Sequence, residues 1–421
     1  MPRRLAGKPA RYSVMLGSAL AVCLGASACS SAASSSSSGP AAAGGTSSSA
    51  ASSTPFTVLG ITAQSGAFAA YGGADVASLK AAAAYLNANG GILGHKVQVT
   101  IENDNSAPAT AVSLVQQYLS DNPAPNDVYP GSESTETQAL FPLLAQKNLL
   151  AMAGSSGFTE LETGKYPDIF SPLGPATESL TALVADLKSK GYKSVGLLVE
   201  GLEFTQSEVA PLTADLKGAG ISYHVSDFQP TALDLTSEVS QLKADSPDAL
   251  VVLAISASAG YALKARAQLG WNVPVVGDLA FGDTSLTSLV PASDLQGVQA
   301  VIYGSSKYLT PSQYPPGLST FLKYMQPFMT STISGLPMVT LGRAWDGLMA
   351  IAAAAKQANS IDASAISKAL EDFGDTSDPN FVVFPKIGFT PSYHENTLTT
   401  IADYPVVQVG SIVGGMLKPA G

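Results

Sequence analysis

The chain has 421 residues, with 22 basic and 32 acidic side chains and a formal net charge of −10 at pH 7. Such an acidic protein is poorly suited to nucleic acid, because that binding depends on neutralising phosphates with lysine and arginine. The sequence holds 2 cysteines and 3 histidines. No two histidines have the spacing of metal ligands, so we expect no metal. The sequence also has no phosphate-binding P-loop, and we expect no cofactor.

The first 28 residues have the features of a secretory signal peptide. Four basic side chains within residues 1–11 precede an apolar run from Val14 to Ala28. A segment that spans a bilayer needs about 20 apolar residues, and this run is shorter. We therefore predict export of the protein and not a membrane span.

Cys29 follows the apolar run directly. Ser27 and Ala28 supply the small residues that precede the cysteine in bacterial lipoproteins, whose cleavage box this segment resembles. Ala26 departs from the box, which usually has leucine there. The resemblance implies lipidation of Cys29 and attachment to the bilayer at the outer face of the cell membrane. Ordinary cleavage nearby with a free thiol is the alternative.

Residues 29–54 predict a flexible tether. After Cys29 they consist almost wholly of Ser, Ala, Gly, Thr and Pro. Such a segment cannot bury enough apolar surface to offset the entropy lost on ordering.

From residue 55 onward, strand and helix patterns alternate. The first series predicts strands at 56–62, 96–102, 127–130 and 149–153, with helices at 70–89, 109–119 and 135–146. The second predicts helices at 177–190, 207–217, 237–244 and 260–269, with strands at 194–199, 221–228, 249–255 and 273–276. Strands separated by 10–15-residue helices form βαβ units on a parallel sheet, so two series predict two similar α/β lobes.

The last third of the chain is less regular. A strongly helical, alanine-rich segment at 339–357 lies far downstream of the two series and suggests that the chain returns to complete the first lobe. Short strands are expected at Asn380–Phe384 and Thr397–Ile401.

Hydroxyl-bearing residues follow several of the predicted strands. In open α/β sheets, ligands bind at the carboxyl ends of the strands, where helix N-termini also offer free N–H groups to an anion. Helix capping and turn formation are the alternative, and they account for the hydroxyl residues of each loop taken singly. The repetition favours a site for a carboxylate or another anion that needs no basic side chain. The segments are Gln64–Gly66 with Tyr71, Gly131–Thr135, Gly154–Gly157 and Ser256–Ser258.

A serine hydrolase is the enzyme alternative. Ser256 to Gly260 follows a buried strand and precedes a helix, as in a nucleophile elbow, with Ser258 as the nucleophile. Asp278 or Asp346, with His394 downstream, would complete the chain order of a triad. The first glycine of the motif is missing, so we predict a binding protein and not an enzyme.

The opening of the body resembles the type I periplasmic solute-binding proteins, and most closely the leucine/isoleucine/valine receptors of ABC transporters. The residues that carry this resemblance are Ile61–Gly66, Ala69–Gly72, Asn87–Val97 and Glu102–Asp104. Further similarity lies at Ala153–Leu161, Tyr166–Phe170, Ser246–Ala249 and Ala265–Gly270, so the resemblance spans about residues 55 to 405.

The resemblance implies two Rossmann-like lobes, the type I periplasmic-binding-protein fold, joined by a three-segment hinge. Lobe one is expected to comprise 55–173 with 304–378, and lobe two 174–303 with 379–415. The crossings are expected near Ser171–Pro175, Ile302–Gly304 and Asp378–Phe381.

The resemblance also implies a set of binding residues. Lobe one would hold a ligand carboxylate through hydroxyl and N–H groups, with an aromatic ring packed on the ligand, and lobe two would add an aromatic and an acidic group. Glu133 inside the carboxylate loop departs from the family pattern, and the family's lobe-two glutamate is matched only loosely by Asp278. The expected ligand-binding residues are Ser65, Tyr71, Ser134, Thr135, Ser155, Ser156, Phe204, Ser256 and Asp278.

The implied function is that of a substrate-binding lipoprotein of an ABC importer. It would deliver a small polar solute, an amino acid or amide, to a membrane permease. A ligand sensor of the same fold that reports to a membrane kinase is the alternative.

Overall fold

The computed structural model describes residues 54–156, 163–175, 177–255, 257–374 and 376–419. These residues belong to one compact unit of the chain, 49–421. The predicted signal peptide, Cys29, the tether up to residue 53 and Ser256 lie outside the described residues.

The first lobe is built on a five-stranded sheet of order β2-β1-β3-β4-β5 with parallel pairs throughout. Strand β1 pairs with β2 and β3 and is buried along almost its whole length, as expected for a strand covered by helices on both faces. Strand β5, which has two residues, was not predicted. The bounds are β1 Phe56–Thr62, β2 Val97–Asn103, β3 Asp127–Tyr129, β4 Ala151–Met152 and β5 Ile169–Phe170.

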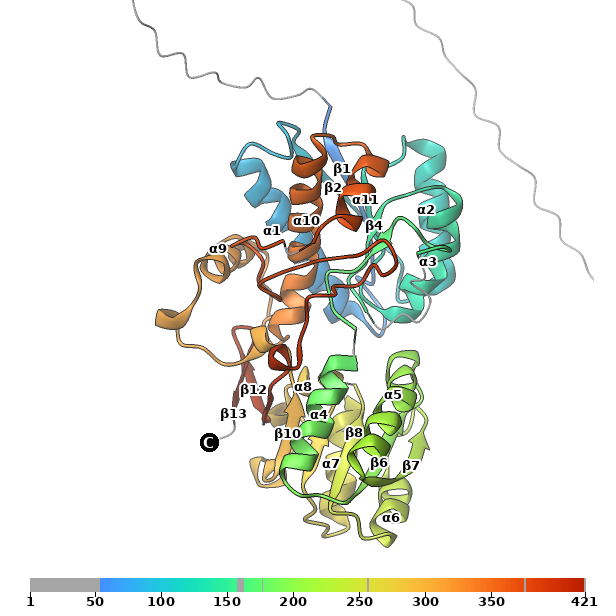
Figure 1. Cartoon of the computed structure of the whole chain (residues 1–421), viewed down its shortest axis with the longest axis vertical. Coiled ribbons are helices and arrows are strands. Elements are labelled where there is room, and N and C mark those ends of the chain that lie inside the picture. The colour runs from blue at the N-terminus through green and yellow to red at the C-terminus, as the bar shows by residue number, and fades with distance from the viewer. Residues whose placement is uncertain (1–53, 157–162, 176, 256, 375, 420–421) are drawn as a thin grey trace, which may run out of the picture. The chain divides into compact units, whose positions relative to one another are not determined.

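Helices from both ends of the body cover this sheet. The early helices are α1 (Ala69–Ala88), α2 (Pro108–Asp121) and α3 (Ser134–Gln146). The late helices are α9 (Pro316–Met325), α10 (Met338–Ala358) and α11 (Ala363–Glu371). The sequence predicted a late helix that returns to the first lobe, and α10 runs beside α1 over the sheet (Figure 1).

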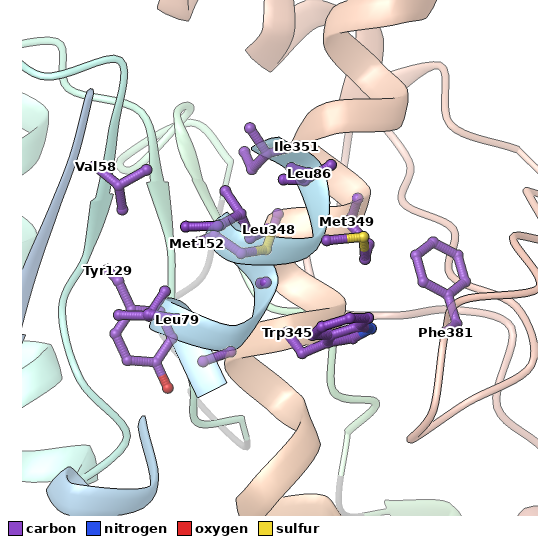
Figure 2. Packing of buried hydrophobic residues seen from close by; sticks show 14 of the residues in the cluster. Val58, Leu79, Leu86, Tyr129, Met152, Trp345, Leu348, Met349, Ile351 and Phe381 are labelled. Carbon is purple, nitrogen blue, oxygen red and sulfur yellow. The ribbon is translucent and has the colours of Figure 1, made fainter. Parts of the chain in front are cut away.

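The core of the first lobe lies between α1, α10 and the sheet. Trp345 is fully buried there, and its indole Nε1 donates a hydrogen bond of 2.8 Å to the carbonyl of Asn380. Figure 2 shows α10 side chains meeting those of α1 and of the strands. Burial of this apolar surface is the main force that holds the returning helix in place.

The second lobe is built on a six-stranded sheet of order β11-β10-β9-β8-β6-β7, parallel except for β11. Its strands are β6 Ser194–Glu200, β7 Ser222–Phe228, β8 Ala249–Leu253, β9 Val275–Gly277, β10 Val298–Val301 and β11 Val406–Gln408. Its helices are α4 Thr177–Ser189, α5 Glu203–Ala219, α6 Thr236–Ala244, α7 Ala257–Gln268 and α8 Leu279–Gly282. The predicted α/β class with two Rossmann-like lobes is confirmed.

The chain passes between the two sheets at three places: between β5 and β6, between β10 and α9, and between α11 and β11. The first and third crossings run side by side, since the Ser171 N–H donates to the His394 carbonyl at 2.9 Å. The second and third crossings are also joined, since the Ile302 N–H donates to the Pro405 carbonyl at 3.0 Å.

The two expected late strands are absent from the structure. Residues 380–384 form no strand, because their polar groups bond to α10: the N–H groups of Val382 and Val383 donate to the Asp346 carboxylate at 2.8 Å each. The backbone of residues 394–396 runs beside the first crossing. The segment 397–400 is irregular and is followed by a 3₁₀ turn at Ile401–Asp403.

The described chain ends in a hairpin, β12 (Gly410–Val413) and β13 (Met416–Pro419). The carbonyl of Gly415 accepts a hydrogen bond of 2.5 Å from the N–H of Met338, the first residue of α10. The remaining short 3₁₀ helices are Leu286–Ser288, Ala292–Leu295, Gly304–Ser306, Pro311–Gln313 and Gln326–Phe328. None of the described helices has both the length and the apolar character needed to cross a bilayer.

Candidate functional site

A cavity of about 130 Å³ lies where loops of both lobes meet. Most of its wall comes from segments that directly follow β1, β3, β4, β6, β8 and β9, which is the edge where parallel α/β sheets bind ligands. The start of α10 and the first two crossings complete the wall. The lining residues are Phe68, Tyr71, Ser132, Glu133, Ser134, Ser155, Ser156, Leu173, Leu202, Glu203, Phe204, Ile255, Leu279, Ala280, Asp283, Tyr303, Val339, Thr340 and Arg343.

Five of the nine residues expected to bind ligand line this cavity: Tyr71, Ser134, Ser155, Ser156 and Phe204. The structure therefore brings an aromatic residue from each lobe to one cavity. Ser65, Thr135 and Asp278 are not among the lining residues, and Ser256 is outside the described residues.

Ser65 joins two loops. Its hydroxyl donates to Asn105 Oδ1 at 2.5 Å and accepts from Asn103 Nδ2 at 3.0 Å. These bonds connect the loop after β1 to the loop after β2, so the hydroxyl has a structural role outside the cavity wall.

The loop at the start of α3 is occupied by a side chain of the protein. Glu133 is the N-cap of α3, and its carboxylate accepts hydrogen bonds from the N–H groups of Thr135 at 2.9 Å and Glu136 at 3.3 Å. These are the N–H groups that the sequence predicted would face a ligand carboxylate. An anion bound here therefore needs other donors. Burial raises the pKa of Glu133 above its usual range, against these hydrogen bonds.

Asp278 lies behind the cavity wall. It caps the short helix α8 by accepting a hydrogen bond of 2.8 Å from the Phe281 N–H, and it is only 1 % exposed. Burial raises its pKa to about 7. Burial, together with the nearby Asp278, raises the pKa of Glu208 well above its usual value. This pair of acids supports the wall at Leu279 and Ala280 from within lobe two.

Asp283 of lobe two lines the cavity, as Glu203 does, and the sequence reasoning missed it. Its Oδ1 is buried and has no hydrogen-bond partner among the described residues. Burial raises its pKa to about 8, so at neutral pH the carboxyl is largely protonated and can donate a hydrogen bond. The motif comparison pointed to Asp278, five positions earlier, and no local pattern distinguishes the two.

Arg343 in α10 lines the cavity from the lobe-one side and was also missed. It is 8 % exposed, and its Nε donates to Asp75 Oδ1 at 3.1 Å. Its Nη2 is buried without a partner in the part of the chain that the structure describes. Burial lowers the pKa of Arg343, but the charges of Asp75 and Tyr129 outweigh it and the pKa rises above its ordinary value.

Asp75 is the centre of a buried hydrogen-bond network. Its carboxylate also accepts from Tyr129 Oη at 2.9 Å and from Ser132 Oγ at 2.5 Å. Burial raises the pKa of Asp75, while Arg343 and the hydroxyl donors oppose that rise. The network ties α10 to α1, β3 and the loop after β3, and it fixes the orientation of the guanidinium.

Two serines after β4 differ in their surroundings. Ser156 is hydrogen-bonded to the side chain of Tyr303. Ser155 is 6 % exposed, and its hydroxyl has no partner among the described residues. A buried polar group without a partner costs about 1–3 kcal/mol. Ser155, Asp283 and Arg343 thus each leave such a group at one mostly apolar cavity, which is the pattern of a ligand site.

The residues of the hydrolase alternative are engaged elsewhere. The hydroxyl of Ser258 donates to Glu200 Oε1 at 2.7 Å. His394 is fully buried, with Nδ1 at 3.1 Å from the Ile169 carbonyl and its ring stacked on Phe170, and burial lowers its pKa to about 4. No described hydrogen bond joins Ser258 to His394. Over the described residues, no group of three or more His, Cys, Asp or Glu is placed to hold a metal ion.

Solved structures of low sequence identity share this fold. A periplasmic binding protein type 1 from Bordetella pertussis Tohama I is 17% identical, with a TM-score of 0.73 over 87% of this chain and 100% of that chain. The branched-chain amino acid transporter substrate-binding protein LivJ from Streptococcus pneumoniae, solved with isoleucine, is 18% identical, with a TM-score of 0.67 over 84% and 99%.

A third similar structure is a solute-binding protein of an ABC transporter from Rhodopseudomonas palustris BisB5, in complex with 3,4-dihydroxybenzoic acid. It is 18% identical, with a TM-score of 0.66 over 84% of this chain and 91% of that chain. None of the curated proteins matches the sequence. The periplasmic binding protein family matches residues 55–411, nearly the whole of the described body, and the chain belongs to that family.

Proposed function

We propose that this protein is the substrate-binding lipoprotein of an ABC importer. It binds a small polar solute, an amino acid or amide, between its two lobes and delivers it to a membrane permease. The observation that carries the proposal is the cavity to which both lobes contribute, with three buried polar groups that lack partners in the described structure.

The composition of the wall supports binding of a compact solute with one polar end. Tyr71 from lobe one and Phe204 from lobe two supply aromatic surface, while Ser155 and Arg343 supply hydrogen-bond donors. A ligand between two lobes is largely removed from water. Each polar contact is therefore stronger than it would be in an open groove, which favours specific binding of the solute.

The ligands of similar structures support a small organic solute. Isoleucine occupies the pneumococcal LivJ structure and 3,4-dihydroxybenzoic acid the Rhodopseudomonas structure. A fatty acid transporter protein from Thermomonospora curvata is also similar, with a TM-score of 0.67. These solutes differ in shape, so the residues of this cavity decide the ligand.

The proposed location is the outer face of the cell membrane. The sequence supports it through the signal-like segment 1–28, the small residues Ser27 and Ala28 before Cys29, and the Ser/Ala/Gly-rich segment 29–54. A single acyl anchor binds a membrane only marginally, whereas the two chains of a diacylated cysteine hold it stably. A Cys29→Ala variant should be released from the membrane fraction, and retention there would contradict the lipid anchor.

A thermal-shift screen of the purified full chain tests the binding function. Amino acids, amides, sugars, polyols and aromatic acids are added singly. A ligand present at a hundred times its dissociation constant adds about 2.7 kcal/mol of stability, which raises Tm measurably. If no solute in the screen raises Tm, the proposed function is contradicted.

A further inference from the structure

Arg343 is the one cationic side chain that the described residues contribute to the wall of the cavity. Among the described residues, the carboxyl groups in the wall are those of Glu133, Glu203 and Asp283, and Asp75 lies behind it. Asp75 is hydrogen-bonded to Arg343 itself, and Glu133 is bonded to backbone N–H groups of α3. The guanidinium is therefore the group with which a negatively charged ligand atom can pair.

The guanidinium is oriented before any ligand arrives. Its Nε is bonded to Asp75 Oδ1, and Asp75 is itself held by Tyr129 and Ser132. This arrangement uses one edge of the guanidinium and leaves Nη2 without a partner among the described residues. A fixed guanidinium loses little conformational freedom on binding, which favours a planar anion such as a carboxylate.

A serine hydroxyl in the cavity wall also lacks a hydrogen-bond partner. Ser155 is buried in the same wall, and its hydroxyl lacks a partner in the described structure. Asp283 lines the same cavity with a buried Oδ1 that has no partner among the described residues, and the charge of Arg343 opposes the rise in its pKa.

We propose that Arg343 is the specificity-determining residue of the site and selects solutes with a free carboxylate against their neutral amides. Asp75 is the positioning residue that holds the guanidinium in place. The inference rests on the proposed binding function and narrows it: of the two solute classes, amino acid and amide, the site takes the acid. The hydroxyl loops then supplement a charged anchor and do not act alone.

The test compares matched pairs of acid and amide on the purified full chain at pH 7. The probes are isoleucine with isoleucinamide, and 3,4-dihydroxybenzoate with its amide, titrated calorimetrically up to 10 mM. The wild-type protein is expected to bind at least one acid on the order of 10- to 100-fold more tightly than its amide, as a hydrogen-bonded ion pair predicts.

Three variants locate the effect. Arg343→Gln should reduce the affinity for the acid on the order of 10- to 100-fold and leave the amide little changed. Asp75→Asn should reduce the ratio of acid to amide affinity in the same direction, which a purely structural role would not do. The double variant D75N/R343Q removes both buried charges, so it remains informative if either single variant fails to fold. Lys356→Gln, exposed on the same helix, is the matched control.

The titrations either support or overturn the role proposed for Arg343. Acid preference in the wild type that is lost in R343Q or in D75N/R343Q, and kept in K356Q, supports the proposal. Equal binding of acid and amide, or acid preference that survives the loss of Arg343, overturns it while the binding function stands. Failure of every acid to bind at 10 mM also overturns it. The thermal-shift screen then shows whether the proposed function falls with it or a neutral solute is the ligand.

Discussion

Arg343 and Asp75 are 268 residues apart in the sequence and meet through a hydrogen bond of 3.1 Å between Nε and Oδ1. Asp75 lies in α1 and Arg343 in α10, so the contact fixes the returning helix to the first helix of the body at the edge of the cavity. This one interaction therefore both holds the returning helix α10 in lobe one and orients a side chain of the candidate site.

Loss of one member of this pair should destabilise the fold. Asp75→Ala leaves the guanidinium of Arg343 buried without its partner, and breaking a buried ion pair in this way costs about 3–5 kcal/mol. The free energy of unfolding in urea measures it. A double-mutant cycle with R343Q should show coupling of at least ~0.5 kcal/mol. Independent, additive effects would contradict a direct interaction.

Ser155→Ala should separate binding from stability. Its buried hydroxyl has no partner in the described structure, so its removal should not lower the free energy of unfolding and should raise it, by at most about 1–3 kcal/mol. If the hydroxyl donates to a ligand anion, its loss weakens binding by about 1.5–3 kcal/mol. Calorimetric titration with the best acid of the panel checks this. Ser113→Ala, exposed on α2, is the control, and unchanged affinity in S155A would remove Ser155 from the site.

Gly154→Ala should disturb the network around Asp75. A Cβ at this position would lie 2.0 Å from Tyr129 Oη, which donates to Asp75. Relief of such a clash costs about 1–3 kcal/mol and displaces the tyrosine. Lower Tm together with weaker acid binding is expected. Gly164→Ala meets nothing within 4 Å and serves as the control. A wild-type Tm in G154A would contradict the packing described.

The stability of the unliganded protein should fall as pH rises from 5 to 8.5. Burial raises the pKa of Asp127, Asp283 and Asp346 to about 8 each. Each then binds a proton in the folded state that the unfolded chain, with a carboxyl pKa near 3.8, has already released. This contribution to stability is complete below pH ~4 and is lost as pH rises through about 8.

Buried His394 opposes this trend, because its pKa is lowered to about 4 and it favours folding at higher pH, but it is one group against several. Tm measured from pH 5 to 8.5 at constant ionic strength should decrease, by at least ~2 °C overall. Asp127→Asn, away from the cavity wall, should flatten the profile. A Tm that rises toward pH 8.5 would contradict the buried, protonated carboxyls.

Local patterns in the sequence determined the class and layout of this protein. The alternation of apolar strands with helices of regular length predicted parallel sheets in two lobes, because burial on both faces of a strand and on one face of a helix leaves different periods in the sequence. The hydroxyl-rich loops were recognisable for the same reason: they follow strands, and strand ends meet at one edge of a sheet. Tyr71, Ser134, Ser155 and Ser156, which line the cavity, were predicted in this way, whereas Phe204 was predicted from the family resemblance.

Only the tertiary structure decided which charged groups reach the cavity. Asp278 and Asp283 belong to one short segment, and the turn of α8 places the second in the wall and the first behind it. The Glu133 carboxylate accepts hydrogen bonds from N–H groups at the start of its own helix, and so occupies the donors that were predicted to bind an anion. Arg343 lies in α10, whose alanine-rich sequence is typical of a buried helix. Its partner Asp75 is distant in the sequence. Side-chain direction and long-range packing set these positions, and neither leaves a periodic trace in the chain.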